Sequence, residues 1–298
     1  MPTIYTNAES NIRKTWMLIS VFLVIIIGFG WIFSNVFQNP AVLIYAVIFS
    51  LVINIASFWY SDKVVLALTR AKPIKKQDNP ELYRLVENLC ITAGLPSPPI
   101  YILNESQPNA FATGRDKNHA VIAVTRGLLE KLDKAELEGV ISHELSHIGN
   151  KDMLLMTMVV VLVGFISIIS NMFTRSLFFG GFRRNNDREG GQAGSIFALV
   201  GLVLAILSPI VAMLIQFAIS RKREFLADAS GALLTRYPEG LARALEKIGA
   251  DKNPMRVASA STSHLFISNP LRGQNFLTLF STHPPLEERI KALRGMTI

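Results

Sequence analysis

The chain has 298 residues, of which 50% are hydrophobic and 17% charged, and its formal net charge is +8. This composition argues against an ordinary soluble domain, in which about 25% of residues are charged. The basic residues concentrate beside long apolar runs and do not alternate with aromatic residues in a polar domain. They therefore indicate the lipid bilayer as a partner and argue against nucleic acid. The single cysteine, Cys90, excludes an internal disulfide.

Two apolar runs near the start of the chain, 16–33 and 41–60, contain no charged residue. Each is long enough to cross a hydrocarbon core about 30 Å thick, so residues 1–76 are expected to form an uncleaved transmembrane hairpin. The connection at 34–40 is uncharged, whereas basic residues flank the outer ends: Arg13, Lys14, Lys63, Arg70, Lys72, Lys75 and Lys76. The positive-inside rule predicts that both outer ends lie in the cytoplasm.

Residues 77–152 are expected to form the first part of a cytoplasmic domain. Asp78-Asn79-Pro80 predicts the start of a helix that ends at Gly94. Three short apolar runs with flanking turn residues predict strands of a small sheet: 100–103, 110–113 and 120–125. Asp133, with Glu136 three residues later, resembles a capping box and predicts the start of another helix.

That second helix carries His143-Glu144-Leu145-Ser146-His147, an H-E-x-x-H motif. Histidines four residues apart lie on one helical face and can bind one zinc ion, with Glu144 beside them as the base of a hydrolase. A buried stripe is expected next to the histidines: Val140, Ile141, Leu145 and Ile148. The metal-binding face is therefore expected to be distinct from the packing face. Asp152 is expected to end the helix or to contact a metal ligand, and not to bind metal itself.

Residues 153–220 are expected to contain two further apolar membrane segments, at about 153–172 and 196–218, joined by a mobile loop. If both segments cross the membrane, the basic loop between them departs from the positive-inside trend. Two alternatives stay open, a second transmembrane hairpin and a hairpin that is embedded in the membrane or lines a chamber. Residues 221–298 are expected to form the second part of the domain that begins at residue 77.

A catalytic zinc site needs a third protein ligand besides the two histidines. The extended metzincin motif is excluded, because Asn150 and Met153 stand where that motif has a glycine and a histidine. Glu224, at the cytoplasmic end of the fourth apolar run, is the candidate third ligand. Asp228 lies four residues later on the same helical face, and we expect it to accept a hydrogen bond from a ligand histidine.

In such a site Glu144 takes a proton from the attacking water and later passes it to the leaving amine. The oxyanion that forms needs a hydrogen-bond donor. The candidates are His283, before two prolines, and Arg289, about two turns along the helix that follows. Each also has a simpler interpretation, His283 as a capping or packing residue and Arg289 as a solvated helix residue.

Four segments together resemble the HtpX family of integral-membrane zinc metalloproteases, which are related to the CAAX prenyl proteases: 143–147, Glu224-Phe-Leu-Ala-Asp228, Asn109-Ala-Phe-Ala-Thr-Gly114 and His283-Pro-Pro285. The resemblance covers nearly the whole chain. It implies a mainly α membrane protein with helical transmembrane segments and a cytosol-facing, gluzincin-type zinc protease domain that contains a small β-sheet. It also implies one Zn²⁺ per subunit, bound by His143, His147 and Glu224, with Glu144 as the base.

The resemblance further implies that Asn109, Ala110 and Phe111 hold the substrate backbone, since an extended peptide can add to a strand edge. It implies that His283 and Arg289 line the site. The expected location is the plasma (inner) membrane, with several spans and the active site facing the cytoplasm. The expected substrates are polypeptides, above all damaged or misfolded membrane proteins that are cleaved in protein quality control and stress response.

Two other functions stay open. A processing peptidase for one membrane or prenylated-type substrate would use the same site on fewer peptides. A non-catalytic membrane scaffold would hold zinc in a closed site of four ligands, but the chain has no cysteine near His143 to complete one. An intramembrane protease is less compatible, because polar residues flank the motif helix at 133–138 and 150–152.

Overall fold

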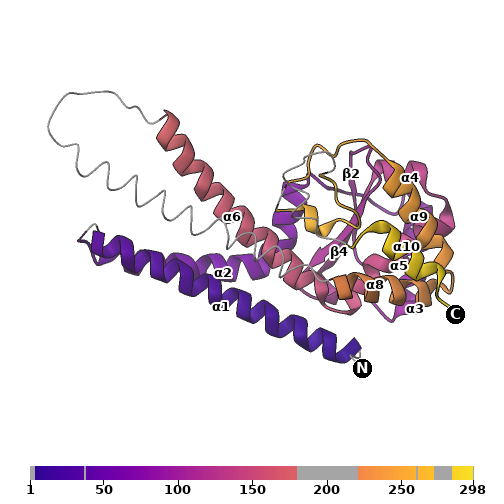
Figure 1. The fold of residues 1–298 in the computed structure, drawn as a ribbon, viewed down its shortest axis with the longest axis horizontal. Helices are drawn as coiled ribbons and strands as arrows, with labels where there is room; N and C mark the ends of the chain where they lie inside the picture. The colour runs from indigo at the N-terminus through magenta and orange to yellow at the C-terminus, as the bar shows by residue number, and fades with distance from the viewer. Residues whose placement is uncertain (1–3, 37, 180–220, 260, 272–283, 298) are drawn as a thin grey trace.

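The computed structural model describes residues 4–36, 38–179, 221–259, 261–271 and 284–297. Two long helices at the start of the chain, α1 (Ile4–Val36) and α2 (Ala41–Leu68), run beside each other as a hairpin (Figure 1). Both are long and apolar enough to cross a membrane, as the sequence predicts. Large apolar side chains are exposed along the two helices, including Trp16, Trp31, Tyr45 and Trp59. Such a surface is suited to lipid and not to water.

A four-stranded sheet lies in the compact part of the molecule, with strand order β1-β2-β4-β3. Three strands match the predicted ones: β2 (Ile100–Leu103), β3 (Ala110–Gly114) and β4 (Ala120–Thr125). The fourth, β1 (Lys72–Pro73), was not predicted, because two residues within a basic stretch give no strand pattern. β2 and β4 are parallel, and β3 pairs antiparallel with β4 at the edge of the sheet.

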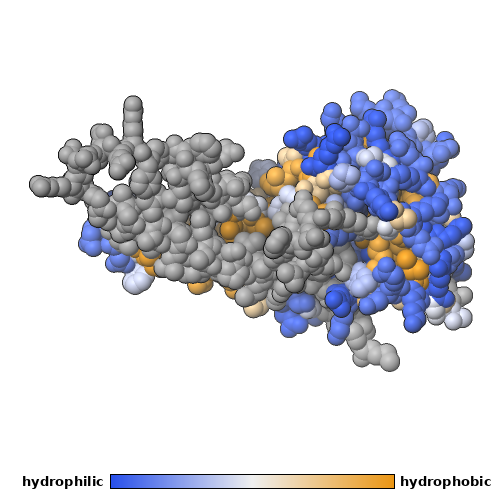
Figure 2. Space-filling view, turned by 45° about the horizontal axis from the view of Figure 1, so that its top comes forward, coloured by the Kyte–Doolittle hydropathy of each residue, from blue (hydrophilic) through white to orange (hydrophobic). Residues whose placement is uncertain are grey.

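Helices surround the sheet and bury one main core. The predicted first helix is α3 (Pro80–Ala93), where the Asn79 side chain accepts a hydrogen bond from the Leu82 nitrogen and Gly94 ends the helix at φ 65°. The other helical elements of this part are η1 (Lys117–His119), α4 (Arg126–Lys131), α5 (Lys134–Gly149), α8 (Arg221–Thr235), α9 (Pro238–Ala250), η2 (Ser263–Leu265) and α10 (Leu286–Arg294). The surface of this compact part is mainly hydrophilic, with some apolar patches (Figure 2).

A sharp bend separates α5 from α6 (Asp152–Phe179), with 85° between α5 and the Asp152–Gly164 part of α6. The bend is made at Lys151, which has φ 57°. Together, α5 and the Asp152–Gly164 part of α6 are long and apolar enough to form one bent membrane span. The first half of α6 packs against α1, where Leu18 and Phe22 are buried beside Leu155 and Leu162. The segment predicted at 196–218 lies outside the described residues.

The apolar stripe of α5 lies in the main hydrophobic core as expected, with Val140, Ile141, Leu145 and Ile148 all buried there, but the face that carries the histidines is buried as well. α5 begins with the predicted capping box, formed by Asp133 and Glu136. From Gly139 to Ile148, however, every residue except Ser146 is buried, because α3, α8, α9 and β3 all pack on this one helix. A periodic apolar stripe indicates only the first packing surface of a helix, and polar residues on its other faces can be buried as well when they have partners.

Candidate metal centre

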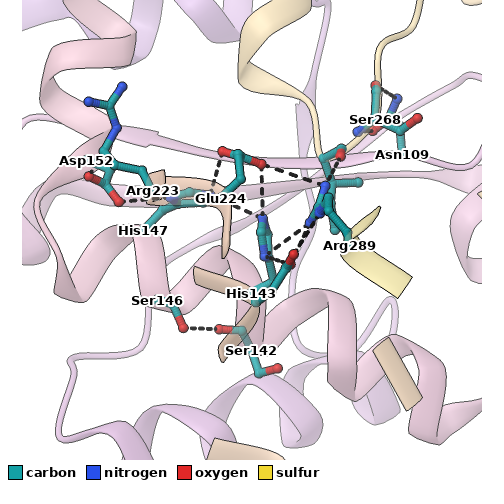
Figure 3. Close-up of polar contacts among 12 residues, drawn as sticks. Asn109, Ser142, His143, Ser146, His147, Asp152, Arg223, Glu224, Ser268 and Arg289 are labelled. Atoms are coloured by element: carbon teal, nitrogen blue, oxygen red, sulfur yellow. Dashed lines mark hydrogen bonds and ion pairs between the residues drawn. The ribbon is translucent and has the colours of Figure 1, made fainter. Parts of the chain in front are cut away.

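Three side chains from two helices converge in a buried position: His143 and His147 from α5, and Glu224 from the first turn of α8. The Nε2 atoms of the two histidines lie 3.2 Å apart. The carboxylate oxygens of Glu224 lie 3.9 Å from Nε2 of His143 and 3.6 Å from Nε2 of His147 (Figure 3). The sequence-based expectation that Glu224 meets the two histidines is thus matched in space.

This set of donor atoms fits zinc. Ligand nitrogens at about 2.05 Å from a tetrahedral zinc ion are separated by about 3.3 Å, close to the separation of the two Nε2 atoms. The Glu224 oxygens lie a few tenths of an ångström farther from the two Nε2 atoms than ligands of one zinc ion would. A small shift of the Glu224 side chain would close this difference. Two imidazoles and one carboxylate are also the ligand set of catalytic zinc sites that keep a fourth position open.

Close packing of α8 against α5 brings Glu224 to the histidines, and Gly231 allows it. A Cβ atom at Gly231 would lie 2.9 Å from the backbone nitrogen of His143 and 3.1 Å from the carbonyl carbon of Ser142. Real Cβ atoms do not approach backbone so closely, so any side chain at this position would separate the two helices. Gly231 therefore sets the distance between Glu224 and the H-E-x-x-H motif.

A buried carboxylate holds the ring of His143. Its Nδ1 atom lies 2.9 Å from Oδ1 of Asp228, as the four-residue step from Glu224 predicts. Arg289, from α10, donates to both Asp228 oxygens, from Nε at 2.8 Å and from Nη2 at 2.6 Å. Burial alone would raise the pKa of Asp228, but the charge and hydrogen bonds of Arg289 lower it to about 2. Asp228 is therefore ionised and fixes the orientation of the ring.

A second carboxylate holds the other histidine. Nδ1 of His147 lies 3.1 Å from Oδ2 of Asp152, which the bend before α6 places beside it. Burial opposes protonation of His147, yet the hydrogen bond to Asp152 and the charge of Glu224 raise its pKa to about 9. Burial lowers the pKa of His143 to about 4. A metal can bind Nε2 of His147 only when its proton leaves, so higher pH favours binding.

Glu144 is buried between these groups, with 1% of its surface exposed. One carboxylate oxygen, Oε1, has no hydrogen-bond partner among the described residues. The backbone of Ala112, on the edge strand β3, lies near this carboxylate and favours its charged form. Burial raises the pKa of Glu144 to about 7. A carboxyl group with such a pKa can accept and return a proton near neutral pH, which is what a general base must do.

Arg289 lies at the site, and three hydrogen bonds hold its guanidinium. Besides Asp228, it contacts the Ile267 carbonyl oxygen at 2.9 Å from Nη1 and Oε2 of Glu224 at 3.7 Å. The simpler interpretation of Arg289 as a solvated residue is wrong, because its side chain is completely buried. His283, the other candidate oxyanion donor, lies outside the described residues.

The three candidate substrate-binding residues lie at the start of β3, and all are buried. The Asn109 side chain donates to the Ser268 carbonyl oxygen at 2.9 Å, and its own Oδ1 accepts from the Ser268 nitrogen at 3.4 Å. The Ala110 carbonyl accepts from the Ile267 nitrogen at 3.0 Å. The Phe111 ring packs edge-on against Phe266. In this structure, residues 266–268 therefore cover the start of the edge strand.

Two contacts at the site have no counterpart in the sequence-based expectations. Arg223, which looks like part of a basic membrane flank, is buried, with Nε 3.6 Å from Oδ1 of Asp152. Asn11, on α1, donates to the same oxygen. In the sequence, Arg223 and Asn11 are marked only by their position at the edge of an apolar span. Residues that reach toward lipid head groups have the same position, so it does not predict burial at the site.

Residues 76–297 match the family described as Peptidase family M48. The chain belongs to this family. Among M48 relatives, a protein called Protease HtpX homolog from Caldanaerobacter subterraneus subsp. tengcongensis is 45% identical over 298 residues, covering 99% of both chains. Proteins of the same name from Syntrophobacter fumaroxidans and Thermococcus sibiricus are 48% and 45% identical, covering 96% and 94% of this chain and 99% and 95% of theirs.

The M48 fold is also seen in a solved structure. The crystal structure of S. mikatae Ste24p aligns with a TM-score of 0.50 and 21% identity, covering 94% of this chain and 67% of that one. At this identity the likeness concerns the fold alone. Together with the two apolar helices, membership of M48 and the HtpX relatives confirms that the chain is a membrane metalloprotease. Its substrates are therefore polypeptides.

Proposed function

We propose that this chain is a zinc-dependent endopeptidase that cleaves damaged or misfolded membrane proteins at the cytoplasmic face of the plasma (inner) membrane. The observation that carries the proposal is the meeting of His143, His147 and Glu224 beside the buried carboxylate of Glu144. The apolar hairpin of α1 and α2 supports a membrane location. The basic residues at both outer ends of the hairpin support the cytoplasmic orientation.

One zinc ion per subunit is the proposed cofactor, with His143, His147 and Glu224 as its ligands. Bound zinc would supply a Lewis acid that polarises the peptide carbonyl and acidifies a water molecule. Glu144 would accept the proton of that water on Oε1, which has no hydrogen-bond partner among the described residues, and would return it to the leaving amine.

We assign Asp228 and Arg289 to positioning. Asp228 orients the ring of His143, and Arg289 orients Asp228 through two parallel hydrogen bonds. Three N–H groups of Arg289, on Nε, Nη1 and Nη2, donate to Asp228 and to the Ile267 carbonyl oxygen, and these bonds support a positioning role. His283 stays the proposed donor to the oxyanion.

The proposed substrate-binding edge is β3, through Asn109, Ala110 and Phe111. An extended peptide can pair with an edge strand through main-chain hydrogen bonds, which gives affinity with little sequence preference. Such binding suits an enzyme whose substrates are all unfolded but have no common sequence. For a substrate to pair with the Ala110 carbonyl oxygen, the hydrogen bond that Ile267 now donates to that oxygen must first break.

The test compares the wild type with Glu144→Gln, in full-length protein purified in detergent and loaded with zinc. Glutamine keeps the shape of the side chain but cannot accept the proton, so cleavage of unfolded casein is expected to fall by about 100-fold or more. Glu138→Gln, on the same helix but outside the site, is the matched control and should keep full activity.

Metal analysis of both variants shows whether zinc is retained at one ion per subunit. Equal cleavage by wild type and Glu144→Gln would contradict the proposed mechanism. The peptide products from an unfolded membrane protein in liposomes then define the substrate class. Many cleavage sites on the cytoplasmic side support quality control, whereas a single site in a single substrate indicates a processing peptidase.

A further inference from the structure

Asn11 is a polar residue in the first turn of the apolar span of α1, yet only 3% of its surface is exposed. A buried amide in such a helix is costly unless its hydrogen bonds are satisfied. Its Nδ2 atom donates to Oδ1 of Asp152 at 2.5 Å and to the Asn150 carbonyl oxygen at 3.3 Å. Its Oδ1 atom accepts from Nη1 of Arg223 at 3.5 Å. All these partners lie in the turn between α5 and α6 or at the start of α8.

Asp152 is the residue through which Asn11 reaches the metal centre. One carboxylate oxygen of Asp152, Oδ2, contacts Nδ1 of His147. The other oxygen, Oδ1, accepts from Asn11 and lies 3.6 Å from Nε of Arg223. Asn11 and Arg223 therefore hold this buried carboxylate, and the carboxylate holds the imidazole ring of His147. The ring in turn presents Nε2 to His143 and Glu224.

The two histidines are held in the same way from two different parts of the molecule. The carboxylate beside His143 is Asp228, and its orienting group is Arg289 of α10. The carboxylate beside His147 is oriented in part by Asn11, which belongs to the membrane hairpin. α1 is held in place by its own packing, since Leu18 is buried in the contact with α6.

We propose that Asn11 is a positioning residue for His147, so that the first membrane helix is part of the metal centre. Without the Asn11 amide, Asp152 loses a hydrogen bond from a fixed donor, and the ring of His147 becomes less well oriented for a metal. Zinc affinity then depends on the Asn11 amide itself, and not only on the apolar packing of α1 against α6. The inference goes beyond the proposed function but rests on the proposed zinc site.

The experiment measures zinc affinity of the full-length protein in detergent by competition with chelators. Asn11→Leu keeps the size of the side chain and removes both polar atoms, and Asn11→Ala is measured beside it in case leucine does not fit. Removal of partners outside the metal ligands costs roughly 10-fold to 100-fold in affinity, and we expect about 10-fold here. The Co²⁺-substituted variants should also show altered visible absorption bands, which report ligand geometry without any measurement of activity.

Two control variants separate positioning from helix packing. Asn35→Leu makes the same replacement at the exposed far end of α1, where the amide donates to the Trp31 carbonyl oxygen of its own helix. Leu18→Ala weakens the packing of α1 on α6 without changing a polar atom. Both controls are expected to bind zinc with the affinity and Co²⁺ spectrum of the wild type.

The inference is overturned if both Asn11 variants bind zinc as the wild type does, or if Leu18→Ala weakens binding as much as Asn11→Ala. Weaker binding confined to the Asn11 variants supports it. A wild-type protein that binds no zinc would overturn the proposed zinc site, and this inference with it. The two failures are thus distinguished by the affinity of the wild type alone.

Discussion

Nδ1 of His143 lies 2.9 Å from Oδ1 of Asp228, and both side chains are buried. The carboxylate accepts a hydrogen bond from the Nδ1–H group of His143. The proton therefore stays on Nδ1, and the lone pair of Nε2 points toward His147 and Glu224. The contact therefore fixes both the tautomer and the direction of the ring. It makes the metal centre depend on a residue that touches no metal.

Asp228→Asn is expected to weaken zinc binding by roughly 10-fold to 100-fold, because a neutral amide holds the His143 ring less firmly. Zinc affinity is measured by chelator competition. The matched control is Asp116→Asn, which removes a similar carboxylate from the exposed His119 and should leave zinc affinity unchanged. Unchanged affinity in Asp228→Asn would contradict this assignment.

Gly231→Ala is expected to destabilise the protein by about 1–3 kcal/mol and to weaken zinc binding, because the new methyl group meets the α5 backbone and separates Glu224 from the histidines. Thermal unfolding and metal content are the measurements. Gly149→Ala serves as control, because a Cβ atom there meets nothing within 4 Å. Equal effects of the two substitutions would show that close packing at Gly231 is not required.

Arg289→Ala is expected to cost about 3–5 kcal/mol of stability, because it leaves the buried carboxylate of Asp228 without its partner. Arg289→Lys keeps the positive charge but cannot make the two parallel hydrogen bonds, so its stability should lie between those of the wild type and Arg289→Ala. Both should lose zinc affinity. If kcat falls while zinc affinity and thermal unfolding stay as in the wild type, Arg289 acts on the oxyanion and not through Asp228.

An exposed arginine provides the control for Arg289. Arg294, on the same helix, pairs with Glu239 and Glu246 at the surface. Its replacement by alanine is expected to cause a much smaller loss of stability, because surface ion pairs are screened by solvent. A similar loss for both variants would indicate general damage to α10.

The alkaline limit of stability should depend on Cys90. Burial, together with the nearby charge of Glu87, raises the pKa of its thiol to about 11 from an ordinary value of 9.0. Between these values the unfolded chain releases a proton that the folded chain retains, so stability falls as pH rises from about 9 to about 11. Thermal unfolding between pH 8 and 11 is expected to show a shallower decline for Cys90→Ala. Parallel declines for both proteins would contradict a shifted thiol.

Local patterns predicted the parts of the fold that rest on neighbouring residues. The Asn79 cap and Gly94 define α3, three apolar runs define three strands, and the Asp133 capping box starts α5. The spacing of Glu224 and Asp228 predicted their common face. In each case the interaction joins residues a few positions apart, where spacing determines geometry.

Contacts over long sequence distances could not be predicted in the same way. Asn11 and Asp152 are 141 residues apart, and nothing in either local pattern indicates the other. The 85° bend at Lys151 places Asp152 beside His147, but a lysine in a left-handed conformation leaves no sequence signal. The burial of α5 on nearly all sides likewise depends on four elements that pack from elsewhere in the chain.

The contact of Arg289 with Asp228 also links the packing of α10 to metal binding. The three candidate ligands lie on α5 and α8, so a chain in which α10 has not packed already carries all of them. In such a chain Asp228 lacks the arginine that orients it, and the ring of His143 is less well fixed. A molecule with a misplaced α10 is therefore expected to bind metal weakly, even though none of its ligands is missing.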